Sequence, residues 1–560
     1  MMRYFFLVLL MLTRFGIVAQ KDFSLNEGWK FREVNAGKWL KAEVPGTVHT
    51  DLMRSQVIED PFFRDHASKL LWISEKDWEY KNEFFLSSNF NPNQKKYIVF
   101  DGLDTYADIY LNEQFLGRVD NMFRQWRFEA IGLKPGANQI IVRFYSPLRI
   151  ADSLAKISDI KRPCENNRHY LRKAQYHFGW DWAPQLPTCG IWKEVYLSDE
   201  PSVKYEAAKY ADVKLIQTAD SIGQSFYFRV KGQATFMKGA NWVPADVFLP
   251  RITKNRYRHL LIAAKEAHFN MLRVWGGGIY EDDDFYTLCD SLGIYVWQDF
   301  MFAGAMYPGD PDFIQNVKEE AKQQILRLRK HPCIVLWCGN NEIDEAWNNW
   351  GWQKQFEISA NDSMRLWKEY ATLFHEVLPE LVRQYDSGRA YISTSPLYGW
   401  GREKSMTHGD SHYWGLWWGI KPIDIMREKV PRFMSEYGMQ AMPNWKSITN
   451  FSIPQDWDTS SRVMKAHQKH PTGYKTLSAY IQQEKLKPIS FRAFAEATQE
   501  IQHRAVKTAV EAQLQSNGRC MGSLLWQFND CWPVCSWSVI DYYGEKKKAY
   551  YTLQALYKDR

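Results

Sequence analysis

From about residue 224 onward, the chain alternates short apolar segments with longer amphipathic ones, and this alternation limits the possible folds more than any other feature. The short segments have the length of strands that are buried on both faces. In the longer segments apolar residues recur at three- and four-residue spacing, as in Phe313, Val317, Ala321, Ile325 and Leu328. This order predicts βα units arranged around a parallel sheet.

Eight strands are predicted in this region, with helices between them, and together they indicate a (β/α)8 barrel. The strands are expected at residues 234–239, 270–275, 293–300, 333–337, 390–394, 405–410, 431–436 and 522–528. In such a barrel the side chains that carry out chemistry lie at the carboxyl ends of the strands. Those ends are therefore the first candidates for a functional site.

Residues 21–201 have a different periodicity, which is that of a β-sandwich. Short β-rich segments at residues 97–100, 107–111 and 139–144 are separated by Gly, Asn and Pro. The sequence Asn112-Glu113-Gln114 is typical of a hairpin turn between two strands. We predict a connector over residues 202–223 and the barrel domain over residues 224–560.

The amino terminus, residues 1–20, is predicted to be a signal peptide. Arg3 supplies the positive flank, residues 4–12 are apolar, and residues 18–20 resemble a cleavage region. The apolar part is too short to span a membrane, and no later segment is long enough. Only Asn361 and Asn450 begin glycosylation sequons, which favours a periplasm over a lysosome. We therefore predict secretion across the inner membrane into the periplasm, with a lysosomal or extracellular location as the alternative.

Composition narrows the class of ligand. The chain has 25 Trp in 560 residues, clustered beside polar residues, and sugar rings present apolar C–H faces that stack on indole. The net charge of +7 is mild and no long basic run is present, so no nucleic-acid partner is expected. The eight cysteines lack the spacing of a metal site or a disulfide scaffold, and we expect no metal and no cofactor. Cys531 and Cys535 are either a pair or, as we favour, buried free thiols.

Two predicted strands end in a carboxylate. The strand at residues 333–337 runs into Cys338-Gly339-Asn340-Asn341-Glu342, and the strand at residues 431–436 ends in Glu436. Either strand alone could simply be followed by a polar turn. Two acids at two strand ends are, however, what glycosidic cleavage requires, because one carboxyl protonates the leaving oxygen and the other acts at the anomeric carbon.

A second cluster lies near the end of the predicted sandwich, in the sequence YHFGWDWAP at residues 176–184. It holds Asp181 between Trp180 and Trp182. A carboxylate in a hydrophobic core would need a buried partner, so a contact with a ligand is the favoured interpretation. Gly276, Gly277 and Gly278 lack the spacing of a phosphate-binding loop, and a nucleotide site is rejected.

Several of these segments together resemble the β-mannosidases of glycoside hydrolase family 2. The resemblance rests on KGANWVPAD (238–246), LRVWGGGIYE (272–281), CGNNE (338–342), MSEYG (434–438), FGWDWAP (178–184) and WQFND (526–530). It covers nearly everything after the signal peptide, in the order of the family. It implies a galactose-binding-like jelly roll before a (β/α)8 barrel, and a retaining exo-β-mannosidase that removes terminal β-D-mannose from oligosaccharides or glycans. By the same resemblance Glu342 is the acid/base and Glu436 the nucleophile.

The resemblance and the strand ends together define an expected substrate-binding set. It comprises Trp180, Asp181, Trp182, Trp275, Asn341, Trp350, His412, Tyr413, Trp414 and Trp526. Asn341 would hydrogen-bond the 2-hydroxyl of the sugar, and the residues from the sandwich would close the pocket around the terminal sugar. Oligomeric state is not predicted by any of these features.

The chain also departs from the family pattern. Members usually carry an immunoglobulin-like domain between sandwich and barrel, where this chain has only the connector, and further β-domains after the barrel, which are not expected here. Three related activities remain alternatives, namely β-galactosidase, β-glucuronidase and exo-β-glucosaminidase. A non-catalytic carbohydrate-binding protein is a further alternative, although binding alone would require neither Glu342 nor Glu436.

Overall fold

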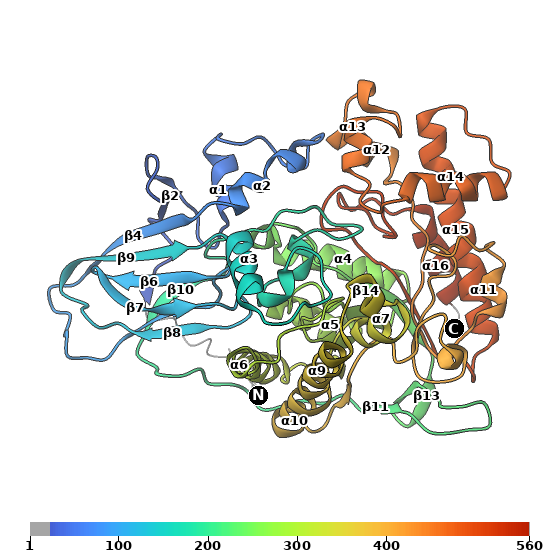
Figure 1. The fold of residues 1–560 in the computed structure, drawn as a ribbon, viewed down its shortest axis with the longest axis horizontal. Helices are drawn as coiled ribbons and strands as arrows, with labels where there is room; N and C mark the ends of the chain where they lie inside the picture. Colours follow the sequence, from blue (N-terminus) through green and yellow to red (C-terminus); the bar gives the residue numbers. More distant parts are fainter. Residues whose placement is uncertain (1–22, 559–560) are drawn as a thin grey trace, which may run out of the picture.

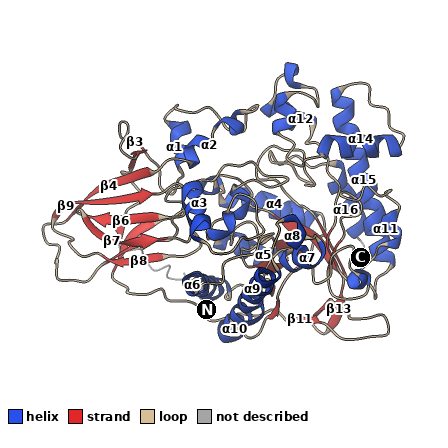
Figure 2. Cartoon of the chain, viewed as in Figure 1, coloured by secondary structure: helices blue, strands red, loops and turns tan. Residues whose placement is uncertain are grey.

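A computed structural model describes residues 23–558, so the predicted signal peptide lies outside the described residues. The amino-terminal third of the chain forms a β-sandwich, and the rest forms a barrel with surrounding helices (Figures 1 and 2). Among the described residues, no helix is both long enough and apolar enough to cross a bilayer.

The sandwich consists of two antiparallel sheets. One has the order β1 (Phe23–Ser24), β10 (Val195–Ser198), β5 (Tyr97–Phe100) and β8 (Trp126–Glu129). The other has the order β3 (Leu40–Lys41), β2 (Lys30–Glu33), β4 (Trp78–Leu86), β9 (Gly136–Phe144), β6 (Ala107–Leu111) and β7 (Gln114–Val119). Buried and partly buried residues alternate along β9, as expected for a strand with one face on a core.

Local sequence explains the hairpin between β6 and β7. Asn112 and Glu113 have φ angles of 47° and 70°, the left-handed conformation that two-residue hairpin turns require. The predicted turn at residues 112–114 therefore lies where the structure places one, with Gln114 as the first residue of β7.

The barrel contains a parallel sheet of eight strands that curls around a packed core, which confirms the predicted (β/α)8 fold. The strands are β14 (Met237–Trp242), β15 (Met271–Val274), β16 (Tyr295–Asp299), β17 (Ile334–Cys338), β18 (Ala390–Ile392), β19 (Ser411–His412), β20 (Met434–Glu436) and β21 (Gly522–Leu525). Their spatial order is β18-β17-β16-β15-β14-β21-β20-β19. Beyond the end of β18, Tyr398 and Trp400 donate backbone hydrogen bonds to Asp410 and His412, and these bonds join the two ends of the sheet.

Helices surround both parts of the molecule. Those of the sandwich region are α1 (Val48–Arg54), α2 (Leu71–Ser74) and α3 (Pro147–Ile157). The first part of the barrel carries α4 (Lys254–Glu266), α5 (Asp283–Leu292), α6 (Pro311–Leu328), α7 (Ile343–Asn349), α8 (Trp352–Gln355), α9 (Ala360–Ala371) and α10 (Leu378–Tyr385). Its second part carries α11 (Ile425–Glu428), α12 (Trp445–Phe451), α13 (Arg462–Ala466), α14 (Gly473–Gln483), α15 (Phe491–Gln515) and α16 (Lys548–Tyr557).

The sixth predicted strand, at residues 405–410, is wrong. A 3-10 helix occupies Glu403–Met406, and the strand at this position of the barrel is β19, which begins at Ser411. Residues 405–410 contain few apolar side chains, and Asp410 instead accepts hydrogen bonds in a fully buried position. The other seven predictions each overlap an observed strand.

A small sheet lies at the amino ends of the barrel strands, spanning the predicted boundary between connector and barrel. It is formed by β11 (Val213–Ile216), β12 (Tyr227–Val230) and β13 (Gln233–Thr235). Phe226 and Phe228 are buried against Trp297 and Phe433 inside the barrel. This sheet therefore closes the end of the barrel opposite to the carboxyl ends of its strands.

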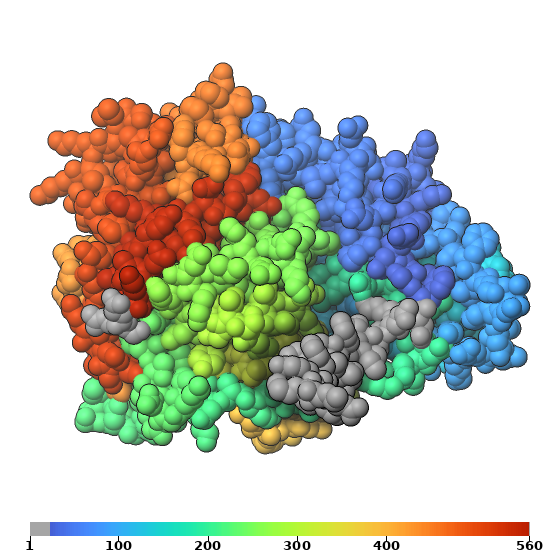
Figure 3. Space-filling view, turned by 180° about the vertical axis from the view of Figure 1, so that it is seen from behind, coloured from blue at the N-terminus to red at the C-terminus, as the bar shows by residue number. Residues whose placement is uncertain are grey.

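The sandwich is fixed to the barrel by buried polar contacts. Arg172 of the sandwich forms an ion pair at 2.7 Å with Glu320 of α6, and both side chains are 1% exposed. A second contact joins Arg64 to Asp456. In Figure 3 the amino-terminal part, in blue, lies directly against a later segment of the chain, in orange. Because a buried charge without its partner costs about 3–5 kcal/mol, the Arg172–Glu320 pair constrains how the two parts are oriented.

Candidate active site

Glu342 follows β17 at the carboxyl end of the barrel sheet and precedes α7. Its backbone has a φ of 61°, which is unusual for a residue other than glycine and costs about 1–3 kcal/mol. The conformation is held by the hydrogen bond from its N–H to the carbonyl oxygen of Ser395, at 2.8 Å. The backbone therefore aims this side chain into the barrel mouth rather than along the helix.

Glu436 is the last residue of β20, and its carboxylate is bound by an arginine from a neighbouring part of the sheet. Nη1 of Arg273 donates a hydrogen bond of 2.5 Å to Oε1 of Glu436. Arg273 is fully buried, and it also donates to Asp299, Asn241 and Asn341. The guanidinium is thereby held rigidly against one carboxylate of the site.

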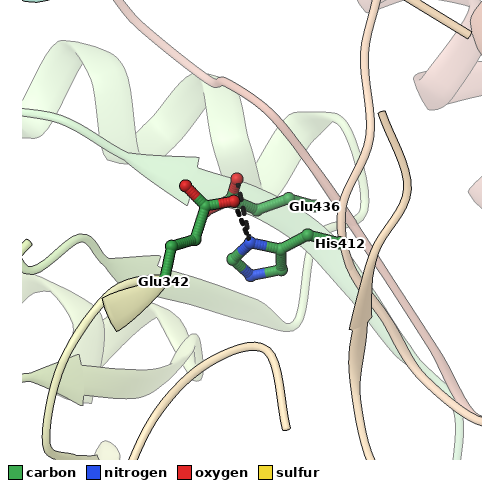
Figure 4. A group of neighbouring side chains, drawn as sticks. All are labelled: Glu342, His412 and Glu436. Carbon is green, nitrogen blue, oxygen red and sulfur yellow. Dashed lines mark hydrogen bonds and ion pairs between the residues drawn. The ribbon is translucent and has the colours of Figure 1, made fainter. Parts of the chain in front are cut away.

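The ring of His412 lies within hydrogen-bonding distance of both carboxyl groups (Figure 4). Its Nδ1 lies 2.9 Å from Oε1 of Glu342 and 3.3 Å from Oε2 of Glu436. One carboxylate oxygen of Glu342, one of Glu436 and one ring nitrogen of His412 all lie within 4.8 Å of one another. The positively charged guanidinium of Arg273 already forms an ion pair with Glu436. The arrangement therefore fits a pair of reacting acids rather than a site for a metal cation.

The two carboxyl groups differ in their electrostatic surroundings. Burial and the charge of Glu436 raise the pKa of Glu342 well above its ordinary value. Burial also raises the pKa of Glu436, but the charge and hydrogen bond of Arg273 oppose that rise. Among the described residues, arginine hydrogen-bonds Glu436 and not Glu342. One group is consequently favoured in its ionised form and the other in its protonated form.

Four of the predicted tryptophans lie together beside the carboxyl groups. The ring of Trp275 contacts Trp180, Trp182 and Trp526 edge-on, with centroid separations of 4.9, 5.5 and 5.5 Å. Trp182 is fully buried and also stacks on Tyr176, so its ring supports this wall from behind. Trp180 remains partly exposed, and the guanidinium of Arg168 lies 4.8 Å from the centroid of its ring.

Asp181, also from the sandwich, is half-buried beside the same wall. Within residues 23–558, no other residue donates a hydrogen bond to its carboxylate. Burial raises its pKa to about 7, and its charge raises the pKa of both Glu342 and Glu436. An unpartnered carboxylate close to both acids is a natural acceptor for hydroxyl groups of a ligand.

The remaining predicted residues lie in different surroundings. Tyr413 is buried with its ring against Trp400, and Trp414 packs against Trp537. Trp350 is 44% exposed and its ring contacts Trp352. It follows α7, about 12 Å of helix beyond Glu342, and the structure does not bring it to the wall of four tryptophans.

Arg273, Asn241 and Asp299 were not in the predicted set. Asn241 and Arg273 lie within β14 and β15, and Asp299 is the last residue of β16. A signal was nevertheless present, because Arg273 is a charged residue in a strand that is otherwise apolar and buried throughout.

A (β/α)8 barrel that presents two neighbouring carboxyl groups, one buried and one partly exposed, at the carboxyl ends of its strands has the fold and the site of a glycoside hydrolase. Known proteins agree with this class. Residues 29–193 match the family described as "Glycosyl hydrolase 2 galactose-binding domain-like". The β-mannosidase of Rattus norvegicus is 30% identical over 97% of this chain and 76% of its own length. The chain therefore belongs to the β-mannosidases of glycoside hydrolase family 2.

Two further relatives extend the comparison. β-Mannosidase B of Emericella nidulans is 30% identical over 95% of this chain and 77% of its own length. The crystal structure of the β-D-mannosidase from Dictyoglomus thermophilum has a TM-score of 0.89 and 35% identity, covering 96% of this chain and 77% of that one. The alignment with the rat protein spans 689 positions, more than the 560 residues here, so this relative contains segments without a counterpart in this chain.

Proposed function

We propose that this protein is a retaining exo-β-mannosidase, which hydrolyses terminal non-reducing β-D-mannose residues by double displacement. The observation that carries the proposal is the pair Glu342 and Glu436, whose nearest oxygens lie within 4.8 Å. Among the described residues, Arg273 hydrogen-bonds Glu436 and not Glu342. Carboxyl groups about 5–5.5 Å apart favour a covalent intermediate, whereas inverting enzymes need a wider gap to admit water.

The reaction assigns a separate role to each acid. Glu436 attacks the anomeric carbon while Glu342 transfers its proton to the departing oxygen, which leaves a glycosyl ester on Glu436 and an ionised Glu342. Glu342 then removes a proton from water, and the water attacks the same carbon to release mannose and regenerate both groups. Each step inverts the anomeric centre, so the product retains the starting configuration.

The sandwich supports the exo mode of action. Trp180 and Asp181 stand outside the barrel sheet and beside its mouth, where they would close the pocket beyond the terminal sugar. Asn341 is held by Arg273, and it would contact the 2-hydroxyl. The substrates would be β-mannoside oligosaccharides or glycans.

The choice of sugar is tested with a panel of nitrophenyl glycosides. We expect the β-mannoside to have the highest kcat/KM, and the product to be β-mannose when its configuration is followed by NMR from the first turnovers. A higher value for the β-galactoside, β-glucuronide or β-glucosaminide would overturn the choice of sugar, and a product of inverted configuration would overturn the retaining mechanism.

The proposed division of the chain follows the same reasoning. Residues 21–201 would form the sandwich, 202–223 the connector and 224–560 the barrel, after a signal peptide at residues 1–20 that directs the enzyme to the periplasm. Expression of the full sequence with cell fractionation tests this destination, and an enzyme retained in the cytoplasm would contradict it.

The pH dependence of kcat/KM is expected to be bell-shaped. Glu436 must be ionised to attack, so activity falls as the pH drops and protonates it. Glu342 must hold a proton, so activity falls again as the pH rises and removes it. Because burial raises both pKa values, the acidic limb should lie above 4.5, the ordinary value for glutamic acid. The two limbs belong to the coupled pair, and a flat profile between about pH 4 and pH 8 would contradict these roles.

Asp181→Ala tests whether the sandwich belongs to the site. Loss of a charged hydrogen bond to the sugar should lower kcat/KM roughly ten- to a hundredfold. The melting temperature should not fall at neutral pH, because folding raises the pKa of Asp181 above its ordinary value of 3.8 and ionisation of this group therefore opposes folding. A variant with wild-type activity and a lower melting temperature would instead make Asp181 a structural residue.

A further inference from the structure

A chain of buried polar groups extends from Glu342 away from the pocket, and the proposed function does not use it. His412 Nε2 lies 3.1 Å from Oγ of Ser395, and that hydroxyl donates a hydrogen bond of 2.7 Å to Oδ2 of Asp410. Ser435 donates to the same carboxylate oxygen at 2.6 Å. His412, Ser395, Asp410 and Ser435 are all at most 1% exposed.

The direction of these hydrogen bonds follows from counting protons. The ionised carboxylate of Asp410 only accepts hydrogen bonds, so the single proton of the Ser395 hydroxyl is directed to it. The Ser395 oxygen therefore presents a lone pair to His412. Nε2 must therefore carry the hydrogen of this contact. In a neutral imidazole the other nitrogen, Nδ1, then has no hydrogen and is an acceptor.

That acceptor lies 2.9 Å from Oε1 of Glu342. Two acceptors cannot form a hydrogen bond unless a proton lies between them, and here the proton belongs to the carboxyl group. Burial and the charge of Arg273 lower the pKa of His412 well below its ordinary value, so the ring is neutral at working pH.

We propose that Asp410 and Ser395 are positioning residues that fix the tautomer of His412 and thereby hold Glu342 in its protonated form. This inference rests on the proposed role of Glu342 as the acid. Asp410 and Ser395 would act through His412, without touching the sugar. Their effect is to raise the pH at which Glu342 loses its proton, since a hydrogen bond accepted from the neutral carboxyl favours that form.

Other charged groups face these residues and contribute to the same titration. They are Glu436 and Arg273 beside His412, Asp181 and Glu345 near Glu342, and Asp299 near Glu436. None of them is altered in the test below, so their contribution is constant across the variants.

Asp410→Asn would reverse the chain of hydrogen bonds with almost no change of shape. The amide oxygen would still accept from the N–H of Leu397, which leaves the NH2 group facing Ser395 and Ser435. Ser395 would then accept from Asn and donate to Nε2 of His412. The ring would carry its hydrogen on Nδ1 and donate it to Glu342, which stabilises the ionised carboxylate.

The experiment measures kcat/KM against pH for two mannosides, one with an alkyl leaving group and one with a dinitrophenyl group. For the alkyl mannoside, Asp410→Asn should move the basic limb down by about one pH unit. For the dinitrophenyl mannoside, whose departure needs no proton, the profile should remain that of the wild type. Ser395→Ala should shift the basic limb for the alkyl mannoside in the same direction but by less. It removes the hydrogen bond that fixes the tautomer of His412 but does not impose the opposite tautomer.

Ser411→Ala is the matched control. Ser411 precedes His412 in β19, is fully buried, and has a hydroxyl without a hydrogen-bond partner among the described residues. This variant should keep the wild-type profile for both mannosides. If Asp410→Asn does not fold, the comparison of Ser395→Ala with Ser411→Ala gives the same test.

Nitrogen NMR of histidine-labelled protein supplies a second measurement, with the His412 signal assigned by its loss in His412→Gln. We expect hydrogen on Nε2 in the wild type and on Nδ1 in Asp410→Asn. An unchanged basic limb for the alkyl mannoside, or hydrogen on Nδ1 in the wild type, would overturn the proposal. If Glu342→Ala retained full activity on the alkyl mannoside, the role of Glu342 would fail instead, while the tautomer measurement would stand.

Discussion

Glu436→Ala is expected to lower turnover by roughly ten-thousand-fold or more, because it removes the group proposed to attack the anomeric carbon. Added azide or formate should restore part of the activity, since a small anion fits the space left by the carboxylate. The anion attacks directly and only once, so the product should be the glycosyl azide or formate of inverted configuration.

The control for this prediction is a measurement that the variant is folded. Arg273 keeps Asp299, Asn241 and Asn341 as hydrogen-bond partners in Glu436→Ala, so the variant should remain folded, as circular dichroism would show. Rescue that gives a product of retained configuration would reverse the two roles and make Glu342 the nucleophile.

Glu342→Ala should have a different signature, because only the acid and base are removed. With an alkyl leaving group kcat/KM should fall roughly 10²- to 10⁴-fold. With a dinitrophenyl leaving group the first step should survive and the glycosyl-enzyme should accumulate, which is seen as a burst of nitrophenol in rapid-mixing experiments. Azide should react with that intermediate and give a product of retained configuration. Equal losses with both leaving groups would contradict the assignment.

The barrel could be predicted because its strands are short, apolar and separated by clearly periodic helices. Residues 405–410 were predicted incorrectly, because the strand of this position is only two residues long, Ser411–His412, and both of them are polar. A strand so short has no periodicity, and its place in the sheet is determined by tertiary contacts such as the hydrogen bond from Ser411 N–H to Phe433 O.

The site was predicted in part for a similar physical reason. Glu342 and Glu436 follow apolar strands, so the change from apolar to polar sequence marks them. Nothing local marks Ser395 or Asp410, because their roles depend on distances between residues far apart in the chain. Arg273 stands out as a charge in an apolar strand, but its partners could not be read from that strand. The sequence pattern likewise could not separate Trp180, which is partly exposed, from Trp182, which is fully buried.

The placement of residues 178–184 has a consequence for engineering. This segment belongs to the sandwich, yet the indole of Trp532 in the barrel donates a hydrogen bond of 2.9 Å to the carbonyl oxygen of Trp182. A chimera that took its sandwich from another relative would therefore receive a new Trp180 and Asp181 along with it. Under the proposed role of these two residues, sugar preference would be inherited through the part of the protein that contains neither acid, and a barrel transplanted by itself would carry the chemistry without the selectivity.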